Sequence, residues 1–180
     1  MLHDAPVHRA APALHRPRSG APLLRPATTA VTGHKIPESV LVVIHTGALD
    51  VLLLERVDHP GFWQSVTGSR ATPDEPLAVT CAREVAEETG HAAPAAAFDD
   101  WRRVHRYAIF PQWRHRYAPG VTHNVEHVFG LQVSGRFTPQ LAPREHRAWR
   151  WLDWRDAADA CFSWTNAQAI RRLGDRAAGA

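Results

Sequence analysis

Residues 83–90 read Arg83-Glu84-Val85-Ala86-Glu87-Glu88-Thr89-Gly90 and contain the strongest signal in the chain. On a helix, at about 100° per residue, Glu84 and Glu88 lie one turn apart on the same face, with Glu87 beside them. Like charges at this spacing repel, and carboxylates are less favourable in the last turn of a helix than in its first. An acidic run is often only a solvated face. Mg2+, however, takes carboxylate ligands and links them to substrate phosphates, so these misplaced charges favour a metal site.

The residues before this run predict where its helix begins. Thr72-Pro73-Asp74-Glu75 has the form of a capping box, with Thr72 as the N-cap and Glu75 reaching back from the third position. A helix is therefore expected over residues 73–89, ending at Gly90. Its apolar residues recur at three- and four-residue spacing, which gives it one face that packs on a core. They are Leu77, Ala78, Cys81, Ala82 and Val85.

The remaining periodicity predicts a mixed β-sheet between helices. Short β-branched runs at residues 40–44 and 51–54 are typical of buried strands, and the turn at residues 46–48 would join them in a hairpin. Further strands are expected at residues 62–67, 104–110, 125–133 and 149–152, and a second helix at residues 165–176. This order of elements supports an α/β fold.

The composition fits one globular domain. The chain has 180 residues, of which 44% are hydrophobic, and this is ordinary for a domain with a sizeable core. No apolar run approaches the roughly 18 residues of a membrane span. Cys81 and Cys161 give neither a metal-binding spacing nor a disulfide framework, so we expect free thiols in the cytoplasm.

Charge is unevenly distributed along the chain. Residues 1–34 carry four arginines against one acidic residue, whereas residues 35–180 hold 17 basic and 17 acidic side chains. A neutral domain gives no charge-based argument for a nucleic-acid partner. The first segment is rich in Ala, Pro and Arg and has no helical or strand period, so residues 1–34 are expected to be a disordered basic tail; a targeting peptide is the alternative. The folded domain is expected to span residues 35–176.

The acidic helix resembles the Nudix box, the signature of the Nudix hydrolase superfamily. The matching residues are Gly68, Glu75, Arg83, Glu84, Val85, Glu87, Glu88 and Gly90. Six residues rather than five separate Gly68 from Glu75, and His91 stands where an apolar residue is usual. The extra residue lies in the loop before the helix, where it adds little closure entropy. The resemblance implies an α/β/α sandwich with a mixed β-sheet.

Segments outside the box resemble the bacterial dihydroneopterin triphosphate diphosphatases. They are residues 62–69, residues 115–122, Glu145-His146 with Trp151-Leu152, and residues 163–170. The resemblance implies a Mg2+-dependent pyrophosphohydrolase of folate biosynthesis that cleaves dihydroneopterin triphosphate to the monophosphate and pyrophosphate, with Mn2+ as a possible substitute for Mg2+. Two alternatives stay open: a dNTP pyrophosphatase acting on dATP or an oxidised dNTP, and a non-catalytic nucleotide-binding Nudix module.

The candidate catalytic residues lie mainly on the acidic helix. Glu84 and Glu88 are the expected Mg2+ ligands, and Glu87 is close enough to complete the cluster. Arg83 is expected to orient these glutamates through charge-assisted hydrogen bonds. By the resemblance, Glu145 is a further acidic residue that binds metal or handles the proton of the attacking water; an exposed loop glutamate is the alternative reading.

The resemblance also implies a substrate-binding set, namely Lys35, Arg56, Thr67, Tyr107, Ala108, Ile109, Phe110 and Ser163. Lys35, the only lysine in the chain, and Arg56 can pair with phosphates, while Tyr107 and Phe110 could bracket a flat ring. A structural role in the core stays open for the aromatic residues. The expected partner is a small-molecule triphosphate, with no nucleic acid and no membrane, and the sequence does not predict an oligomeric state.

Two further motifs are explained without a separate function. His123 and His127 are four residues apart, but on a strand this spacing spans about 13 Å, too far to share one zinc ion. The Arg-rich aromatic stretch at residues 101–117 resembles a platform for single-stranded nucleic acid. It is better explained as a strand and loop beside a triphosphate pocket.

Overall fold

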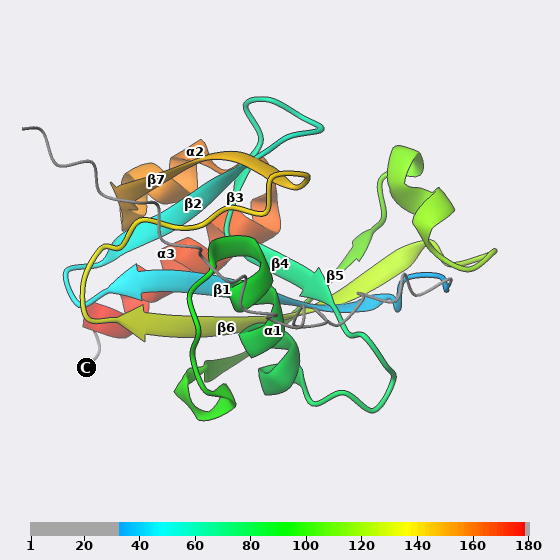
Figure 1. The fold of residues 1–180 in the computed structure, drawn as a ribbon, viewed down its shortest axis with the longest axis horizontal. Helices are drawn as coiled ribbons and strands as arrows, with labels where there is room; N and C mark the ends of the chain where they lie inside the picture. The colour runs from blue at the N-terminus through cyan, green and yellow to red at the C-terminus, as the bar shows by residue number, and fades with distance from the viewer. Residues whose placement is uncertain (1–32, 179–180) are drawn as a thin grey trace, which may run out of the picture. The chain divides into compact units, whose positions relative to one another are not determined.

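The computed structural model describes residues 33–178, so the expected tail at residues 1–34 lies outside the described part except for its last two residues. Figure 1 shows the elements in chain order. They are β1 (Glu38–Thr46), β2 (Asp50–Arg56), β3 (Trp63–Gln64), β4 (Val66–Ser69), α1 (Leu77–Thr89), the 3-10 helix η1 (Ala95–Ala97), β5 (Asp99–Ala108), the 3-10 helix η2 (Pro111–Arg116), β6 (His123–Val133), β7 (His146–Asp153), α2 (Trp154–Ala160) and α3 (Trp164–Ala178).

One seven-stranded mixed sheet organises the described residues. Its main order is β3-β2-β1-β6-β5, with β4 paired to β1 and β7 paired to β2. Strands β1 and β6 run parallel from the pair Glu38 and Val125 to the pair Thr46 and Val133. The other pairings are antiparallel. The predicted α/β fold with a mixed sheet is confirmed.

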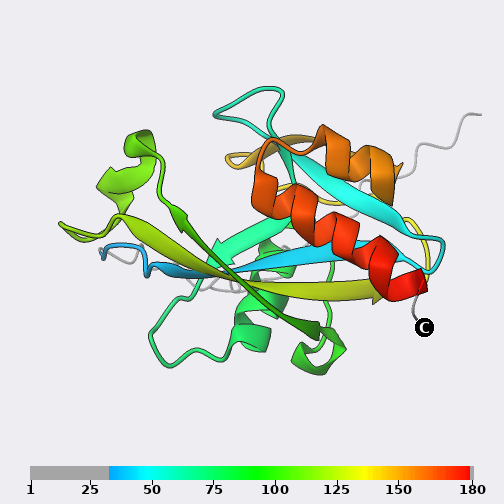
Figure 2. The same cartoon turned by 180° about the vertical axis from the view of Figure 1, so that it is seen from behind.

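Helices cover both faces of the sheet, as Figures 1 and 2 show from opposite sides. Helix α1 covers one face, where Cys81 and Val85 pack in a core that includes Val42 of β1. Helices α2 and α3 cover the other face, where Ile170 packs in a second core that includes Leu41. Alternate residues of β1 enter different cores because successive side chains of a strand point to opposite faces. The result is the expected α/β/α sandwich.

The predicted hairpin forms, with β1 antiparallel to β2 and His45 opposite Val51. The single strand predicted at residues 62–67 is wrong, because the structure has two short strands, β3 and β4, on either side of Ser65. The backbone N–H of Ser65 donates to the side-chain oxygen of Asn166 at 2.7 Å. A contact from a residue far along the chain therefore interrupts the strand.

The strand predicted at residues 104–110 is displaced in the structure. Strand β5 starts at Asp99 and ends at Ala108, and its pairing with β6 is irregular between Asp100 and Arg103. Residues 109–110 follow the strand rather than extend it. The predictions at residues 125–133 and 149–152 are confirmed within the longer strands β6 and β7.

The predicted start of helix α1 at residue 73, with Thr72 as its N-cap, is wrong. The helix starts at Leu77, and Pro76 occupies the N-cap in an extended conformation without a side-chain cap. A proline disfavours the helical conformation in the residue before it, so Glu75 does not join the first turn. The predicted end is confirmed, because Gly90 adopts a left-handed φ of 70° and closes the helix.

The second predicted helix is confirmed as α3, whereas the short helix α2 was not predicted. Asp153 caps α2, since its side chain accepts a hydrogen bond from the Arg155 N–H. The residues that α2 buries are Ala157 and Ala158. Two alanines in a seven-residue helix give too weak an apolar period to identify it from sequence.

Two sequence-level expectations about the chain's chemistry can be compared with the structure. Within residues 33–178, no helix is both long and apolar enough to span a bilayer. Cys81 and Cys161 are free thiols, as predicted. Burial raises the pKa of Cys161 to about 12, so this thiol stays protonated near neutral pH.

Candidate functional site

Arg83 joins the acidic helix to the loop that precedes it. Its guanidinium donates to both carboxylate oxygens of Glu75, at 3.1 and 3.2 Å, and to the Ser69 carbonyl at 2.9 Å. It also donates to Glu84 Oε1 at 2.7 Å and to Glu87 at 3.4 Å. Because charge-assisted hydrogen bonds are directional, these contacts suit the orienting role expected of Arg83.

Gly68 allows the Glu84 side chain to approach the backbone of β4. A Cβ atom at position 68 would lie 1.8 Å from the Glu84 carboxyl carbon, a separation that no side chain can adopt. Position 68 therefore accepts only glycine while Glu84 keeps its place. The extra residue between Gly68 and Glu75 is accommodated in the loop, and both residues still reach their partners on α1.

Glu88, Glu145 and His146 converge at the C-terminal end of α1. One potential ligand atom from each lies within 4.8 Å of the others. Glu88 and His146 are buried, and Glu88 Oε2 is hydrogen-bonded to His146 Nε2 at 3.0 Å. The second ring nitrogen, Nδ1, is buried and has no hydrogen-bond partner in the described part of the chain. The sequence prediction selected both glutamates but missed His146, although it follows Glu145 in a matching segment.

Burial makes two carboxylates of α1, those of Glu84 and Glu88, unusually basic. It raises the pKa of Glu84 to about 7, with Arg83 opposing the rise and Glu88 adding to it. Burial also raises the pKa of Glu88, against the effect of the hydrogen bond with His146. Carboxylates in such surroundings ionise readily only beside a cation. Glu84 and Glu88, together with Glu145, whose carboxylate lies near that of Glu88, are called the acidic group. Their oxygens suit a divalent cation, which prefers oxygen ligands.

Glu87 lies at the edge of the acidic group. Its side chain is 60% exposed, and the Arg83 guanidinium is 3.4 Å from its carboxylate. The structure thus places Glu87 beside the other helix carboxylates, as its spacing predicts, but in contact with solvent. Such a position suits a weaker or intermittent contact with a bound cation.

A cavity of about 460 Å³ lies between β4, the end of β5 and the start of α3. It is lined by every residue of the predicted substrate-binding set: Lys35, Arg56, Thr67, Tyr107, Ala108, Ile109, Phe110 and Ser163. Gly68 also lines this cavity and lies against Glu84. The cavity and the acidic group therefore adjoin through one residue.

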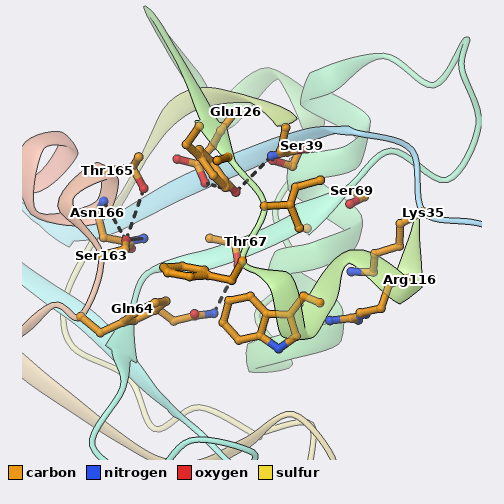
Figure 3. A pocket seen from close by; sticks show the side chains of 18 of the residues that line it. Lys35, Ser39, Gln64, Thr67, Ser69, Arg116, Glu126, Ser163, Thr165 and Asn166 are labelled. Carbon is orange, nitrogen blue, oxygen red and sulfur yellow. Dashed lines mark hydrogen bonds between the residues drawn. The ribbon is translucent and has the colours of Figure 1, made fainter. Parts of the chain in front are cut away.

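The two ends of the cavity carry opposite charge (Figure 3). Lys35 and Arg116 lie at one end, Glu126 lies at the other, and Thr67 lies between them. Burial lowers the pKa of Lys35 and Arg116 lowers it further, whereas the acidic group opposes both effects. The Lys35 end is thus the cationic end and the one that feels the acidic group.

Aromatic rings form much of the cavity wall. Phe162 stacks on Phe62 with ring centroids 4.6 Å apart, and Phe110 meets Trp113 edge to face at 5.3 Å. The Arg56 guanidinium lies 5.1 Å from the centroid of the Trp113 ring. Phe110 was predicted at the site, whereas Trp113 and Phe162 were missed. Such walls suit a flat aromatic ligand.

The sequence prediction also missed a polar group on the sheet beneath the cavity. Asn124 donates through Nδ2 to Ser39 Oγ at 2.7 Å and to the Tyr107 hydroxyl at 3.1 Å. Glu126 lies next in phase on β6 and is only 3% exposed. The sequence did contain a signal for Glu126. It lies two residues before the buried Val128, on the same face of β6, where an apolar residue is usual.

Comparison with known sequences identifies the family. The NUDIX domain model matches residues 35–173. A dihydroneopterin triphosphate diphosphatase of Escherichia coli (strain K12) is 42% identical over 143 residues, which cover 78% of this chain and 93% of the relative. A dihydroneopterin triphosphate diphosphatase of Haemophilus influenzae is 38% identical over 142 residues, which cover 77% of this chain and 88% of the relative.

Solved structures agree with these relatives. The structure of the E. coli dihydroneopterin triphosphate pyrophosphohydrolase matches with a TM-score of 0.71 and 41% identity, over 78% of this chain and 96% of that one. A C. elegans Ap4A hydrolase matches with a TM-score of 0.58 at 19% identity, over 81% of this chain and 100% of that one, and shares the fold. By its sequence, its fold and its acidic helix, the chain belongs to the Nudix family.

Proposed function

We propose that the chain hydrolyses dihydroneopterin triphosphate in folate biosynthesis. The anhydride linkage between the α- and β-phosphates breaks, and the atoms of one water are divided between dihydroneopterin monophosphate and pyrophosphate. One observation carries the proposal: the cavity lined by the whole expected substrate-binding set adjoins the acidic group through Gly68. The names of the relatives at 38–42% identity support the same substrate.

We infer that the acidic group holds a divalent cation, Mg2+ with Mn2+ as a substitute. A bound cation of this kind neutralises phosphate oxygens and lowers the pKa of a nearby water. Glu88 and Glu145 would supply oxygens beside His146, and Arg83 would keep Glu84 in place from the other side. Glu87 would contribute from the solvent edge.

The charge pattern of the cavity orients the substrate in this proposal. Lys35 and Arg116 at the cationic end, next to the acidic group, receive the triphosphate. Arg56, which lines the cavity and lies over the Trp113 ring, also pairs with the phosphates in this proposal. The pterin then lies against the aromatic wall toward Ser163, at the far end from Lys35.

A dNTP pyrophosphatase is the second candidate function. A purine is close in size to a pterin, and the same aromatic wall would accept either ring. A non-catalytic nucleotide-binding module finds less support, because Glu88, Glu145 and His146 converge as a ligand set would. The experiment below separates the three.

The proposed catalytic domain covers residues 35–176, and its proposed location is the cytoplasm. The matched residues 35–173 support the extent of the domain. The free thiols of Cys81 and Cys161 are in keeping with a reducing compartment.

The test offers purified protein with Mg2+ three substrates in parallel: dihydroneopterin triphosphate, dATP and 8-oxo-dGTP. We expect the highest kcat/KM for the pterin, and we expect both Glu84→Gln and Glu88→Gln to reduce it by at least about 100-fold, since each removes a charged ligand. Asp74→Asn, at an exposed acidic residue outside the site, is the matched control. Turnover of none of the three would refute an enzymatic function. A higher kcat/KM for dATP than for the pterin would identify a nucleotide as the substrate instead.

A further inference from the structure

Two buried acceptors on β6 face the cavity with weak partners or none. Glu126 is 3% exposed, and its two oxygens lie 3.4 Å from His105 Nδ1 and 3.5 Å from the Tyr107 hydroxyl, at the outer limit of hydrogen bonding. Asn124 is 1% exposed, and its amide nitrogen donates to Ser39 and Tyr107. Its Oδ1 has no hydrogen-bond partner among residues 33–178. Both residues line the cavity.

Such acceptors are costly to bury without donors. A buried carboxylate needs a cation or strong hydrogen bonds to offset its desolvation, and an unpaired amide oxygen also loses free energy. Within residues 33–178, the salt-bridge partner of Glu126 is His105 alone, and at a long distance. The donors that would satisfy Glu126 and Asn124 are therefore expected to come from a ligand.

The position of these acceptors selects the part of the ligand that they meet. Figure 3 shows Glu126 at the opposite end of the cavity from Lys35 and Arg116. A triphosphate bound at the cationic end thus directs its ring toward Glu126, between walls that include Trp113 and Phe162. The edge of that ring must carry N–H groups to pair with two acceptors.

We propose that Glu126 and Asn124 select the substrate by its 2-amino-4-oxopyrimidine edge. Glu126 accepts two parallel hydrogen bonds, from the ring N3–H and from the 2-amino group of the pterin. Asn124 Oδ1, on the same face of β6, accepts from the remaining amino hydrogen. Adenine presents a ring nitrogen lone pair beside its amino group, and this lone pair repels a carboxylate. The inference rests on the proposed function and adds the residues that select pterin over adenine.

Binding of the ring without phosphates tests this selection apart from catalysis. Dissociation constants are measured by fluorescence titration of metal-free protein with neopterin and with the lumazine that carries the same side chain, in which oxygen replaces the 2-amino group. We expect the wild-type protein to bind neopterin at least about tenfold more tightly, the value of a hydrogen bond to a charged group. In Glu126→Gln, an amide N–H replaces one acceptor and can donate to the 2-oxygen of the lumazine, so the preference for neopterin should be lost or reversed.

Glu38→Gln is the matched control for this experiment. Glu38 also pairs with a histidine, His127 at 3.0 Å, but it does not line the cavity. We expect the wild-type preference for neopterin in this variant. Because the readout is a ratio within one protein, a loss of folded fraction in Glu126→Gln cancels.

Three results would overturn the selection by Glu126: equal binding of both rings by the wild-type protein, binding of neither ring, or an unchanged preference in Glu126→Gln. If that variant does not fold, Glu126→Asp, whose shorter side chain withdraws both oxygens from the ring, provides the ratio in its place. A protein that prefers neopterin through Glu126 but hydrolyses no triphosphate would refute the proposed function instead, so the two failures can be told apart.

Discussion

At the residue scale, the contact between the Gly68 backbone and the Glu84 carboxyl group sets the geometry of the acidic group. In Gly68→Ala, the added Cβ would overlap Glu84 at 1.8 Å, so the carboxylate must move. We expect kcat/KM with Mg2+ to fall by about 10- to 100-fold or more and Mn2+ affinity, measured by titration calorimetry, to fall with it.

Gly135→Ala is the control for this prediction, because a Cβ at position 135 meets no atom of residues 33–178 within 4 Å. It should leave both quantities near wild type. Equal Mn2+ affinity in Gly68→Ala and Gly135→Ala would show that the position of Glu84 does not matter for metal binding.

At the element scale, the loop before α1 is held by side chains rather than by a helix cap. Glu75 accepts hydrogen bonds from Arg83, from the Ala71 N–H and from the Thr80 hydroxyl. We expect Glu75→Gln to lower the free energy of unfolding by about 1–3 kcal/mol, measured by urea denaturation, because charged hydrogen bonds are lost. The neighbouring exposed Asp74→Asn should change it by less than about 0.5 kcal/mol. Equal effects of the two substitutions would show that the hydrogen bonds of Glu75 do not hold the loop.

The raised pKa of Glu84, on α1, predicts how the free energy of unfolding of the metal-free protein depends on pH. The pKa is about 7 in the fold against 4.5 in the unfolded chain, so the contribution of Glu84 is fully present below about pH 4.5 and is lost as the pH rises through 7. Relative to wild type, Glu84→Gln should therefore gain stability between pH 4.5 and 7.5, on the order of 2 kcal/mol. Urea denaturation in the presence of a chelator measures this difference in the free energy of unfolding. A difference that stays constant with pH would show that the fold does not raise the pKa of Glu84.

Local signals in the sequence predict most elements, and long-range contacts account for the errors. The hairpin of β1 and β2, the end of α1 at Gly90 and the helix α3 follow from periodicity and turn chemistry within a few residues. The break between β3 and β4 does not, because Ser65 bonds to Asn166 from α3. The start of α1 was predictable from Pro76, whose effect on the preceding residue outweighs the capping-box pattern.

The candidate site shows the same division. The spacing from Glu75 to Gly90 predicts the acidic helix, and the resemblance supplies the substrate-binding set that the cavity brings together. Trp113 lies in η2, Glu126 lies in β6 and Phe162 lies between α2 and α3, and nothing in their local sequence brings them to one cavity. His146 was within reach, as the residue after Glu145.

At the scale of the whole molecule, two cores on opposite faces of one sheet hold helices α1 and α3 in place, and the first residues of α3 line the cavity. Ile170 of α3 is fully buried in the second core. We expect Ile170→Ala to reduce the free energy of unfolding by about 2–5 kcal/mol, measured by urea denaturation, through the cavity that it leaves. Val79→Ala on α1, where the side chain is 43% exposed, should cost less than about 0.5 kcal/mol. A similar small cost for both would mean that α3 does not pack as described.

The acidic group, the cavity and the family membership together predict one reaction, and its products reveal whether that reaction occurs. Phosphorus NMR of wild-type protein with Mg2+ and dihydroneopterin triphosphate resolves every phosphate species formed. We expect dihydroneopterin monophosphate and pyrophosphate in equal amounts, with neither appearing when a chelator is present. Release of orthophosphate as the first product, or an unchanged triphosphate spectrum with Mg2+, would contradict the account.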